Sequence, residues 1–454
     1  MILLKNCYYI ATFSDKKEEL EGYDILIEGN IVKKIAKDIE PPNHEDVELI
    51  DCSNHVVIPG MINTHHHMYQ ILTRNLKGVQ NAKLFDWLVY LYPIWARIDE
   101  EAVYYSTLLA TAELLKTGAT TTSDHHYLYH RKFRGDFMKT QFEAASKSGI
   151  RFVPSRGSMT RGKSKGGLPP DEVVQSTDEV IEDTLRVIEE YHDPSPLSMK
   201  KIILAPCSPF SVDKDVMIET AKIAREYHLV LHTHLAETED EDRYCVEKYG
   251  KRPLALMEEL GWLGPDVYFA HGIWFNDVEL KLLKETDTGV SHCPTSNMRL
   301  GSGIARIREM IDMGIRVGLG VDGSASNDTS DMLGEVRNAM LLQRVKYGSA
   351  GLTAREALYL ATRGGAELLH LEKLGYIEEG MGADLALFNV NTLQYAGSLS
   401  DPLAALVFTG YNHEVDYTIV NGKIVVRKGE LVSVDEEELT KKVNMISQKI
   451  LKSS

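Results

Sequence analysis

Three consecutive histidines, His65, His66 and His67, carry the clearest chemical signal in this sequence of 454 residues. They follow a short apolar run that is interrupted by Pro59 and Gly60. Alternate side chains of an extended strand share a face, so His65 and His67 should point the same way and His66 should point away. Two imidazoles on one side of a strand end make half of the ligand set that a zinc ion takes from a protein.

The other half of such a ligand set is available at the ends of later apolar runs. A lone histidine is more often a hydrogen-bonded core residue, but histidine or aspartate at several strand ends on one face of a barrel indicates a site. The relevant residues are His232, His234 and Glu237 at the end of the run 229–234, His271 at the end of 267–271, and Asp322 after 316–321. We predict a metal site whose ligands are His65, His67, His234 and Asp322, with His232 supporting a ligand or replacing one.

Three imidazole nitrogens and one carboxylate oxygen suit Zn²⁺, and Fe²⁺ is the alternative. A site for two metals would need a bridging carboxylate or a modified lysine near the end of the fourth strand. The sequence 205–209 offers Cys207 there, but no Lys or Glu. We therefore expect one Zn²⁺ per subunit. His125 and His126, which follow the second strand, are expected to shape the pocket.

These residues together describe the addition of water to a C=N bond, followed by loss of ammonia. Zinc lowers the pKa of a water that it binds from about 15.7 towards about 7, which makes hydroxide available at neutral pH. Asp322 can bind the metal and also take the proton of that water. Glu237 can protonate a ring nitrogen as the adjacent carbon is attacked, and His271 can hold the attacking oxygen by a hydrogen bond.

The residues between 59 and 370 alternate between short apolar runs and longer amphipathic stretches. Eight such units predict an α/β fold, a (β/α)8 TIM barrel whose active site lies at the C-terminal ends of the strands. An open doubly wound sheet is the alternative, but its first strand would normally lead into a glycine-rich nucleotide loop. The predicted strands are 61–65, 119–124, 151–155, 201–206, 229–234, 267–271, 289–292 and 316–321. The predicted helices include 100–116, 171–191, 213–227, 353–369 and, packing on the outside, 436–451.

The two ends of the chain differ in pattern from residues 59–370, because they consist of short apolar runs joined by tight turns. Asn421 and Gly422 lie between two such runs, and an Asn-Gly pair in this setting predicts a β-hairpin. We predict that residues 1–58 and 371–454 pair into one small β-sandwich domain. Residues 59–370 then form the metal-dependent catalytic barrel.

Composition and charge indicate which kinds of molecule the protein binds. The chain carries 50 Lys and Arg against 66 Asp and Glu, and the net charge of −16 disfavours nucleic acid or an anionic membrane as a partner. No apolar stretch reaches the roughly 18 residues that a membrane span needs. Five scattered cysteines without a CxxC pair predict reduced thiols and a cytoplasmic setting. A small-molecule substrate is the expected partner.

The whole pattern resembles the amidohydrolase superfamily, and within it the branch of cytosine and guanine deaminases and triazine hydrolases. The resemblance is carried by Pro59-Gly60 before His65-x-His67, by His234-Leu-Ala-Glu237, and by His271, residues 291–297, Asp322-Gly323 and residues 380–386. Residues 65–70, 84–88 and 91–95 resemble the 8-oxoguanine deaminases, which convert 8-oxoguanine and water to urate and ammonia. The resemblance implies the ligand and proton-transfer roles given above, and a homo-oligomer.

Five residues near the strand ends are candidates for binding a heterocyclic substrate. Gln70 offers a donor and an acceptor to a purine edge, and Trp87 and Trp95 offer stacking faces, although core packing explains the tryptophans equally well. Arg156 could bind a substrate carbonyl, and Cys207 ends the fourth strand. Guanine, isoguanine, a pterin or a triazine are alternative substrates. A metal-dependent scaffold without activity is an alternative function, but it would not need proton-transfer groups.

One further motif points to a different class of function. Residues 157–164 match the phosphate-loop pattern GxxxxGK[ST], which is typical of nucleotide hydrolases. Such a loop must open a helix whose N-terminal amides hold the phosphates, whereas here two glycines and two prolines follow within 165–170. We predict a flexible basic loop over the third strand that could act as a lid. A P-loop nucleotide hydrolase stays as the remote alternative.

Overall fold

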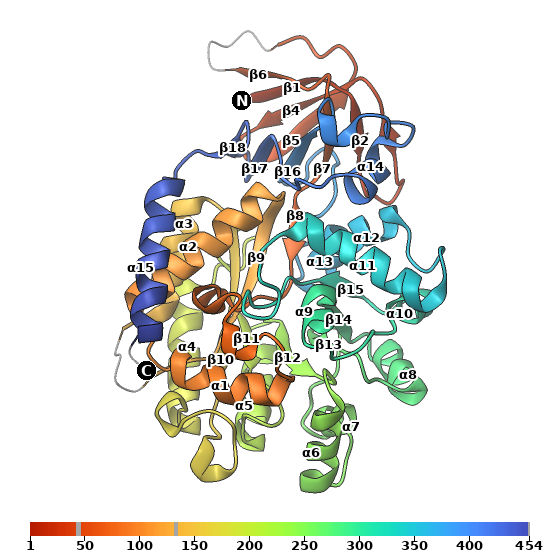
Figure 1. The fold of residues 1–454 in the computed structure, drawn as a ribbon. Coiled ribbons are helices and arrows are strands. Elements are labelled where there is room, and N and C mark those ends of the chain that lie inside the picture. The colour runs from red at the N-terminus through yellow and green to blue at the C-terminus, as the bar shows by residue number, and fades with distance from the viewer. Residues whose placement is uncertain (42–46, 131–134, 453–454) are drawn as a thin grey trace.

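The computed structural model describes residues 1–41, 47–130 and 135–452, and its centre is a barrel of eight parallel strands (Figure 1). Neighbouring strands follow one another in the order of the sequence. The first and last strands are joined by hydrogen bonds from Thr64 N to Leu319 O at 2.9 Å and from Asp322 N to His65 O at 3.0 Å. The predicted (β/α)8 fold is therefore confirmed. The strands are β8 (Met61–Asn63), β9 (Ala119–His126), β10 (Arg151–Ser158), β11 (Ile203–Pro206), β12 (Leu231–Leu235), β13 (Val267–His271), β14 (Gly289–His292) and β15 (Val317–Leu319).

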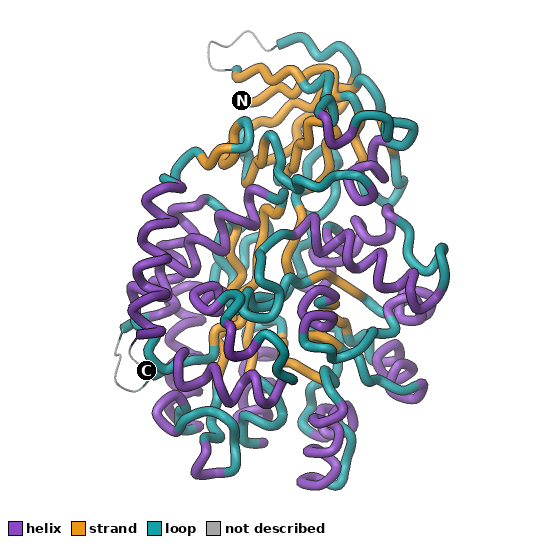
Figure 2. The backbone as a smooth tube through the Cα atoms, in the orientation of Figure 1, coloured by secondary structure: helices purple, strands orange, loops and turns teal. Residues whose placement is uncertain are grey.

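Helices surround the barrel strands, which lie at the centre in Figure 2. Every residue of β11, β13 and β14 is buried, as expected for parallel strands that helices cover on the outside and side chains fill on the inside. The helices of this layer are α1 (Leu84–Trp95), α2 (Glu100–Lys116), α3 (Phe137–Ser148), α4 (Thr177–Tyr191), α5 (Lys214–Glu226), α6 (Glu239–Tyr249), α7 (Pro253–Glu259), α8 (Asp277–Glu285), α9 (Pro294–Arg299), α10 (Ile307–Met313), α11 (Met332–Tyr347), α12 (Ala354–Ala361) and α13 (Arg363–Leu368).

Local contacts move some helix ends away from their predicted positions. The predicted helix 171–191 begins only at α4, because Ser176 caps it: the Ser176 side chain accepts the N–H of Glu179 at 3.2 Å, and Glu179 accepts the N–H of Ser176 at 2.7 Å. The predicted helix 353–369 is divided into α12 and α13. The break lies at Thr362, whose backbone leaves helical geometry at φ −117° and ψ −90°.

Both ends of the chain build a smaller β-domain, at the top of Figure 1. β7 (His55–Pro59) pairs antiparallel with β16 (Leu385–Asn389), so one seven-stranded sheet contains strands from both termini. This sheet and a four-stranded sheet share an apolar core, which confirms the predicted small domain. The predicted hairpin is present at Asn421 and Gly422, whose φ angles of 49° and 73° suit a tight turn. The remaining elements are β1 (Ile2–Cys7), β2 (Tyr9–Ala11), β3 (Glu19–Leu20), β4 (Tyr23–Glu28), β5 (Ile31–Ala36), β6 (Glu48–Asp51), α14 (Pro402–Phe408), β17 (Tyr417–Val420), β18 (Lys423–Arg427) and β19 (Glu430–Leu431).

The C-terminal helix α15 (Glu436–Lys452) lies along α2 on the side of the barrel (Figure 1). Ser447 Oγ donates to Leu72 O at 2.7 Å, and Lys449 Nζ pairs with Asp99 at 3.0 Å. The predicted range 371–454 is therefore not confined to the β-domain in space, because an amphipathic helix packs where its apolar stripe finds a partner. That stripe consists of the buried residues Leu439, Val443, Ile446 and Ile450.

Two further features concern the cysteines and the lengths of the helices. All five cysteines lie in the described part of the chain, where each is buried and unpaired. Among the described residues we find no helix with the length and apolarity of a transmembrane segment.

A buried ion pair joins the barrel to the β-domain. Arg151, at the start of β10, reaches Asp384 with Nη2 3.0 Å from Oδ1 and Nε 3.2 Å from Oδ2. Arg151 Nη1 also donates to the carbonyls of Leu197 and Ser198, both at 2.6 Å. Asp384 Oδ1 accepts the N–H of Asn421 at 2.8 Å. Water barely reaches either side chain, so each charge depends on its protein partners.

We expect Arg151→Met to lower the free energy of unfolding by about 3–5 kcal/mol, because it leaves the Asp384 carboxylate buried without its partner. The double variant Arg151→Met/Asp384→Asn should recover much of that loss, since neither charge is then left alone. Denaturant-induced unfolding followed by circular dichroism measures both free energies. An equal loss in the single and double variants would contradict an unpaired charge as the cause.

Candidate active site

The residues predicted to carry the chemistry lie at strand ends where the backbone leaves extended geometry. Ala236, His271 and Asp322 have φ angles of 53°, 75° and 63°. This left-handed region costs an L-residue about 1–2 kcal/mol. Backbone hydrogen bonds hold the strained residues in place, for example from Asp322 N to His65 O at 3.0 Å. Strain of this kind persists only where the surrounding structure fixes it, and it gathers at functional sites.

The rings of His67 and His234 face each other with their Nε2 atoms 3.0 Å apart. Nδ1 of His67 lies 2.8 Å from the His125 carbonyl, and Nδ1 of His234 lies 2.5 Å from the Cys207 carbonyl. A carbonyl only accepts hydrogen bonds, so each Nδ1 carries the hydrogen and each Nε2 carries a lone pair. Burial lowers the pKa of His234 to about 4, which leaves the ring neutral at pH 7. Two lone pairs this close together repel each other, and a cation beside them relieves the repulsion.

A third ring, that of His65, is oriented by His232. Nδ1 of His232 donates to Tyr268 O at 3.2 Å, so its Nε2 accepts from His65 Nδ1 at 2.8 Å. Nε2 of His65 is then a third lone pair, and it is buried without a hydrogen-bond partner. Oδ1 of Asp322 lies 3.4 Å from the Nε2 atoms of both His65 and His67. Three ring nitrogens and one carboxylate oxygen therefore converge, and this donor set fits a zinc ion.

Two neighbouring histidines have different roles. Nε2 of His125 donates to Ala205 O at 2.7 Å, and its ring stacks on that of His234 with centroids 4.8 Å apart. Its ligand atom lies within 4.8 Å of those of the three predicted histidine ligands, so His125 belongs to the cluster itself. The His66 ring is directed elsewhere, with Nε2 3.0 Å from Ser330 Oγ.

Glu237 and His271 lie beside the metal ligands, in a position to exchange protons. Oε2 of Glu237 is 3.5 Å from Nε2 of His271. Burial, together with the charges of Asp322 and Glu241, raises the pKa of Glu237 well above its usual range. A raised pKa favours the protonated form of this carboxyl, which is the form that can donate a proton. Nδ1 of His271 lies 3.0 Å from the side-chain nitrogen of Asn297, which fixes the orientation of the ring.

A narrow cavity of about 40 Å³ adjoins the predicted ligands. Of the predicted substrate-binding residues, Gln70, Trp87 and Cys207 line this cavity. Oε1 of Gln70 and Nε1 of Trp87 are buried and have no hydrogen-bond partner in the protein, so both are available to a ligand. The cavity is also lined by Leu84, Leu88, Tyr92, Tyr127, Phe210, Leu300 and Ser326.

The structure does not bring Arg156 or Trp95 into this cavity. The Arg156 guanidinium pairs with Asp183 at 2.7 Å and stacks over the Tyr129 ring at 4.0 Å. The Trp95 indole is buried in the core, where Nε1 donates to Thr73 Oγ1 at 3.0 Å. Trp95 is therefore a core-packing residue, which was the alternative to its prediction as a substrate-stacking residue.

Several residues at the site were not singled out from the sequence. Tyr127 directly follows the histidine pair at the end of β9, and Asn297 ends the stretch 291–297 that begins in the last two residues of β14. Their places just beyond strand ends were the available signal. Phe210 and Leu300 gave no such signal, because apolar residues in loops are more often packing residues.

The phosphate-loop pattern does not form a phosphate loop. Residues 157–158 belong to β10, and only two 3₁₀ turns lie between them and the start of α4 among the described residues. Arg161 is only 6% exposed, and its guanidinium donates to the hydroxyls of Tyr244 and Tyr249 at 2.8 Å. The basic segment is therefore tied to α6 at this point, whereas a flexible loop was expected. No helix N-terminus is available there to hold phosphates.

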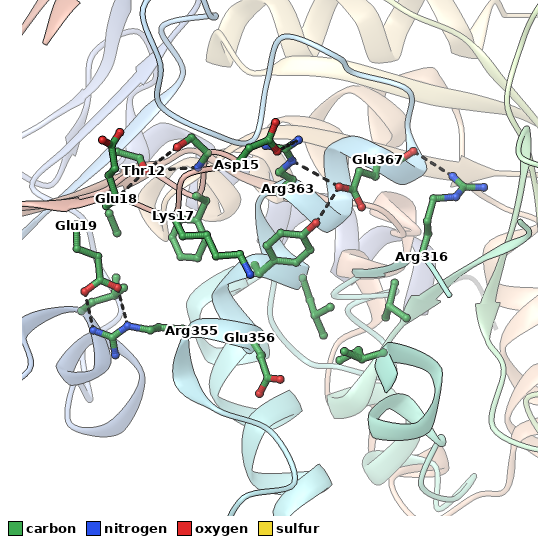
Figure 3. A pocket seen from close by; sticks show the side chains of 18 of the residues that line it. Thr12, Asp15, Lys17, Glu18, Glu19, Arg316, Arg355, Glu356, Arg363 and Glu367 are labelled. Atoms are coloured by element: carbon green, nitrogen blue, oxygen red, sulfur yellow. Dashed lines mark hydrogen bonds and ion pairs between the residues drawn. The ribbon is translucent and has the colours of Figure 1, made fainter. Parts of the chain in front are cut away.

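A larger cavity of about 600 Å³ lies away from the metal ligands, where the N-terminal segment meets α12 and α13 (Figure 3). Two of its arginines are paired within the protein: Arg355 pairs with Glu19 at 2.6 Å, and Arg363 pairs with Asp15 at 2.8 Å. None of the described residues that line it is a buried polar side chain without a partner. It therefore lacks the features that make the smaller cavity a candidate active site.

The chain belongs to the amidohydrolase family, whose sequence model matches residues 56–425. It is 42% identical over 426 residues to 8-oxoguanine deaminase from Pseudomonas aeruginosa, which covers 94% of each chain. It is 36% identical over 444 residues to hydroxydechloroatrazine ethylaminohydrolase from Pseudomonas sp. strain ADP, covering 95% of this chain and 92% of that relative. The crystal structure of a mutant atrazine chlorohydrolase from Arthrobacter aurescens TC1, complexed with zinc and atraton, superposes with a TM-score of 0.94 at 32% identity and covers 98% of this chain and all of that one. The predicted family membership is confirmed.

We expect His232→Phe to weaken metal binding about 10–100-fold, because His65 loses the acceptor that fixes its Nδ1–H. Competition with a chelator, with bound metal measured by mass spectrometry, gives the affinity. His192→Phe, at a histidine far from the cluster, is the matched control and should bind metal as the unmodified protein does. Unchanged affinity in His232→Phe would show that His65 needs no such support.

Proposed function

We propose that this protein is a metal-dependent hydrolytic deaminase that converts 8-oxoguanine and water to urate and ammonia. One observation carries the proposal: Glu237, a buried carboxyl with a raised pKa, lies beside the converging ligand set and 3.5 Å from His271. The 42% identity to an 8-oxoguanine deaminase supports the choice of substrate. Guanine, isoguanine, a pterin or a triazine are the alternatives, because the same chemistry serves each ring.

The proposed cofactor is one Zn²⁺ per subunit, with Fe²⁺ as the alternative. His65, His67, His234 and Asp322 would hold it through the three lone pairs and one carboxylate oxygen that converge there. A bound zinc ion lowers the pKa of water, which supplies the nucleophile at neutral pH. Because the rings are already oriented by the carbonyls of His125 and Cys207 and by His232, little rearrangement is needed on binding.

The protein's own residues account for each proton. Asp322 accepts the proton of the attacking water. Glu237 donates its proton to the ring nitrogen next to the carbon that carries the amino group, so the C=N bond becomes a single bond as the C–O bond forms. His271 holds the oxygen in place through its ring N–H. The amino group then takes the proton held by Asp322 and leaves as ammonia. The proton of the new hydroxyl group returns to Glu237, and the carbon keeps the oxygen as the new carbonyl group.

The lining of the cavity favours an uncharged heterocycle. None of the described residues that line it is a lysine or an arginine. A phosphate or carboxylate on the substrate would therefore be buried without a partner, which is strongly unfavourable. Aromatic and apolar side chains, with the free polar atoms of Gln70 and Trp87, suit a flat ring that bears carbonyl and N–H groups. These features support a free base over a nucleotide.

The direct test is ammonia release from a panel of purines, pterins and triazines by protein of measured metal content. We expect 8-oxoguanine to have the highest kcat/KM and to yield urate in equal amount with ammonia. Removal of the metal with a chelator should abolish the activity, and Zn²⁺ should restore it. A higher kcat/KM for guanine or a pterin would overturn the substrate and leave the family assignment unchanged.

We expect Gln70→Ala to lower kcat/KM for 8-oxoguanine about 10-fold or more, because the ring loses a hydrogen-bonding partner that the buried site cannot replace. Gly323→Ala should have a similar effect, since a Cβ there would lie 1.9 Å from Oε1 of Gln70 and would displace the amide. Bound metal should be unchanged in both variants. Loss of metal in Gln70→Ala would refute its assignment as a substrate contact.

A further inference from the structure

The carboxyl of Glu241 is buried directly behind the segment that carries the proton donor Glu237. Its side chain is only 1% exposed, although it lies in the first turn of α6. Oε1 accepts the N–H of Ala236 at 3.1 Å, and Oε2 accepts the N–H of Glu237 at 3.1 Å. Both carboxylate oxygens are therefore used on the backbone of the two residues that follow strand β12.

These bonds differ from the usual helix cap in the same molecule. Among the described residues, three other helices begin with a capping box, in which the glutamate at the third helical position accepts the N–H of the residue just before the helix. Those pairs are Glu179 with Ser176, Glu279 with Asn276 and Glu356 with Thr353. Glu241 occupies the same position in α6, but it reaches past Thr238 to bind residues 236 and 237. The Thr238 side chain makes no capping hydrogen bond.

The backbone that Glu241 binds is strained and fixed from two sides. Ala236 has a φ of 53°, a left-handed conformation that residues other than glycine rarely adopt. The carbonyl of Ala236 accepts the N–H groups of Ile273 at 2.9 Å and Trp274 at 3.0 Å, from the segment after β13. The N–H of Ala236 is held by Glu241. The ends of β12 and β13 are thus locked together, and Glu237 and His271 are the residues that this lock brings face to face.

We propose that Glu241 is a positioning residue for the deamination. It holds the backbone at residues 236–237 so that the Glu237 carboxyl stays beside His271 and can deliver its proton to the substrate ring. This assignment rests on the proposed function of Glu237. Glu241 itself touches neither the converging metal ligands nor the cavity.

The first test replaces Glu241 by glutamine, which keeps the shape but turns one of the two acceptors into a donor that faces an N–H. We expect Glu241→Gln to lower kcat about 10–100-fold, as small misplacements of a catalytic group do. KM and bound metal should stay close to those of the unmodified protein. Glu356→Gln is the matched control, because it damages an ordinary capping box on the far helix α12 and should lower stability without lowering kcat.

A double-mutant cycle with Glu237→Gln separates positioning from a general structural role. If Glu241 acts through Glu237, Glu241→Gln should cause little further loss once Glu237 has been replaced. Losses that multiply in the double variant would overturn the proposal, and so would an unchanged kcat in Glu241→Gln alone. Full activity in Glu237→Gln would instead overturn the proposed function, so the two failures can be told apart.

A second variant keeps the proposal testable if Glu241→Gln folds poorly. Glycine adopts positive φ without strain, so Ala236→Gly should let the segment take its conformation with less help from Glu241. We expect Ala236→Gly/Glu241→Gln to recover soluble protein and part of the lost kcat. A folded double variant whose kcat equals that of Ala236→Gly alone would show that Glu241 serves stability alone.

Discussion

The site depends on the repulsion among lone pairs of neutral imidazoles that the protein holds in one place. His67 and His234 point their Nε2 atoms at each other because backbone carbonyls bind the opposite ring nitrogens. His232 does the same for His65. Burial lowers the pKa of His67 and His234, so relief of the repulsion by protonation is energetically unfavourable near pH 7. A divalent cation relieves it at once, because each lone pair then becomes a ligand.

Holding rings in this arrangement requires a rigid frame, and the barrel provides it. The ligands come from the ends of β8 and β12 and from the segment after β15, which are distant in sequence. β8 and β15 meet where the barrel closes, and β12 lies across the barrel from them. The closing hydrogen bonds run through the site itself, since Asp322 N donates to His65 O. Gly320 allows this close approach, because a Cβ there would lie 2.6 Å from the Cβ of His65. Closure of the barrel therefore also brings the ligands His65 and Asp322 together.

Sequence reasoning predicted what strand geometry determines. Alternation along a strand separates His65 and His67 from His66, and the barrel rule places His234, His271 and Asp322 at one face. It did not predict where long side chains go once the strand has ended, as Arg156 shows by pairing with Asp183.

Contacts between residues that are distant in the sequence could not be predicted either. In the sequence, Glu241 is one acidic residue among several at the start of a helix. Only the folded chain shows that its carboxylate accepts the N–H groups of residues 236 and 237, which precede that helix. The position of α15 on α2 likewise depends on which surface is left open for its apolar stripe. Such features follow from packing, to which a single sequence gives no direct access.

The described lining of the cavity contains neither lysine nor arginine, and this serves two needs at once. Glu237 can donate a proton at neutral pH only while its pKa stays high, and burial among apolar and aromatic side chains keeps it high. An arginine or lysine in the lining would lower that pKa by favouring the carboxylate. The same side chain would be needed to bind a substrate phosphate or carboxylate. Proton donation by Glu237 and selection of a neutral ring therefore have a common physical origin, and a change that admitted charged substrates would also weaken the acid.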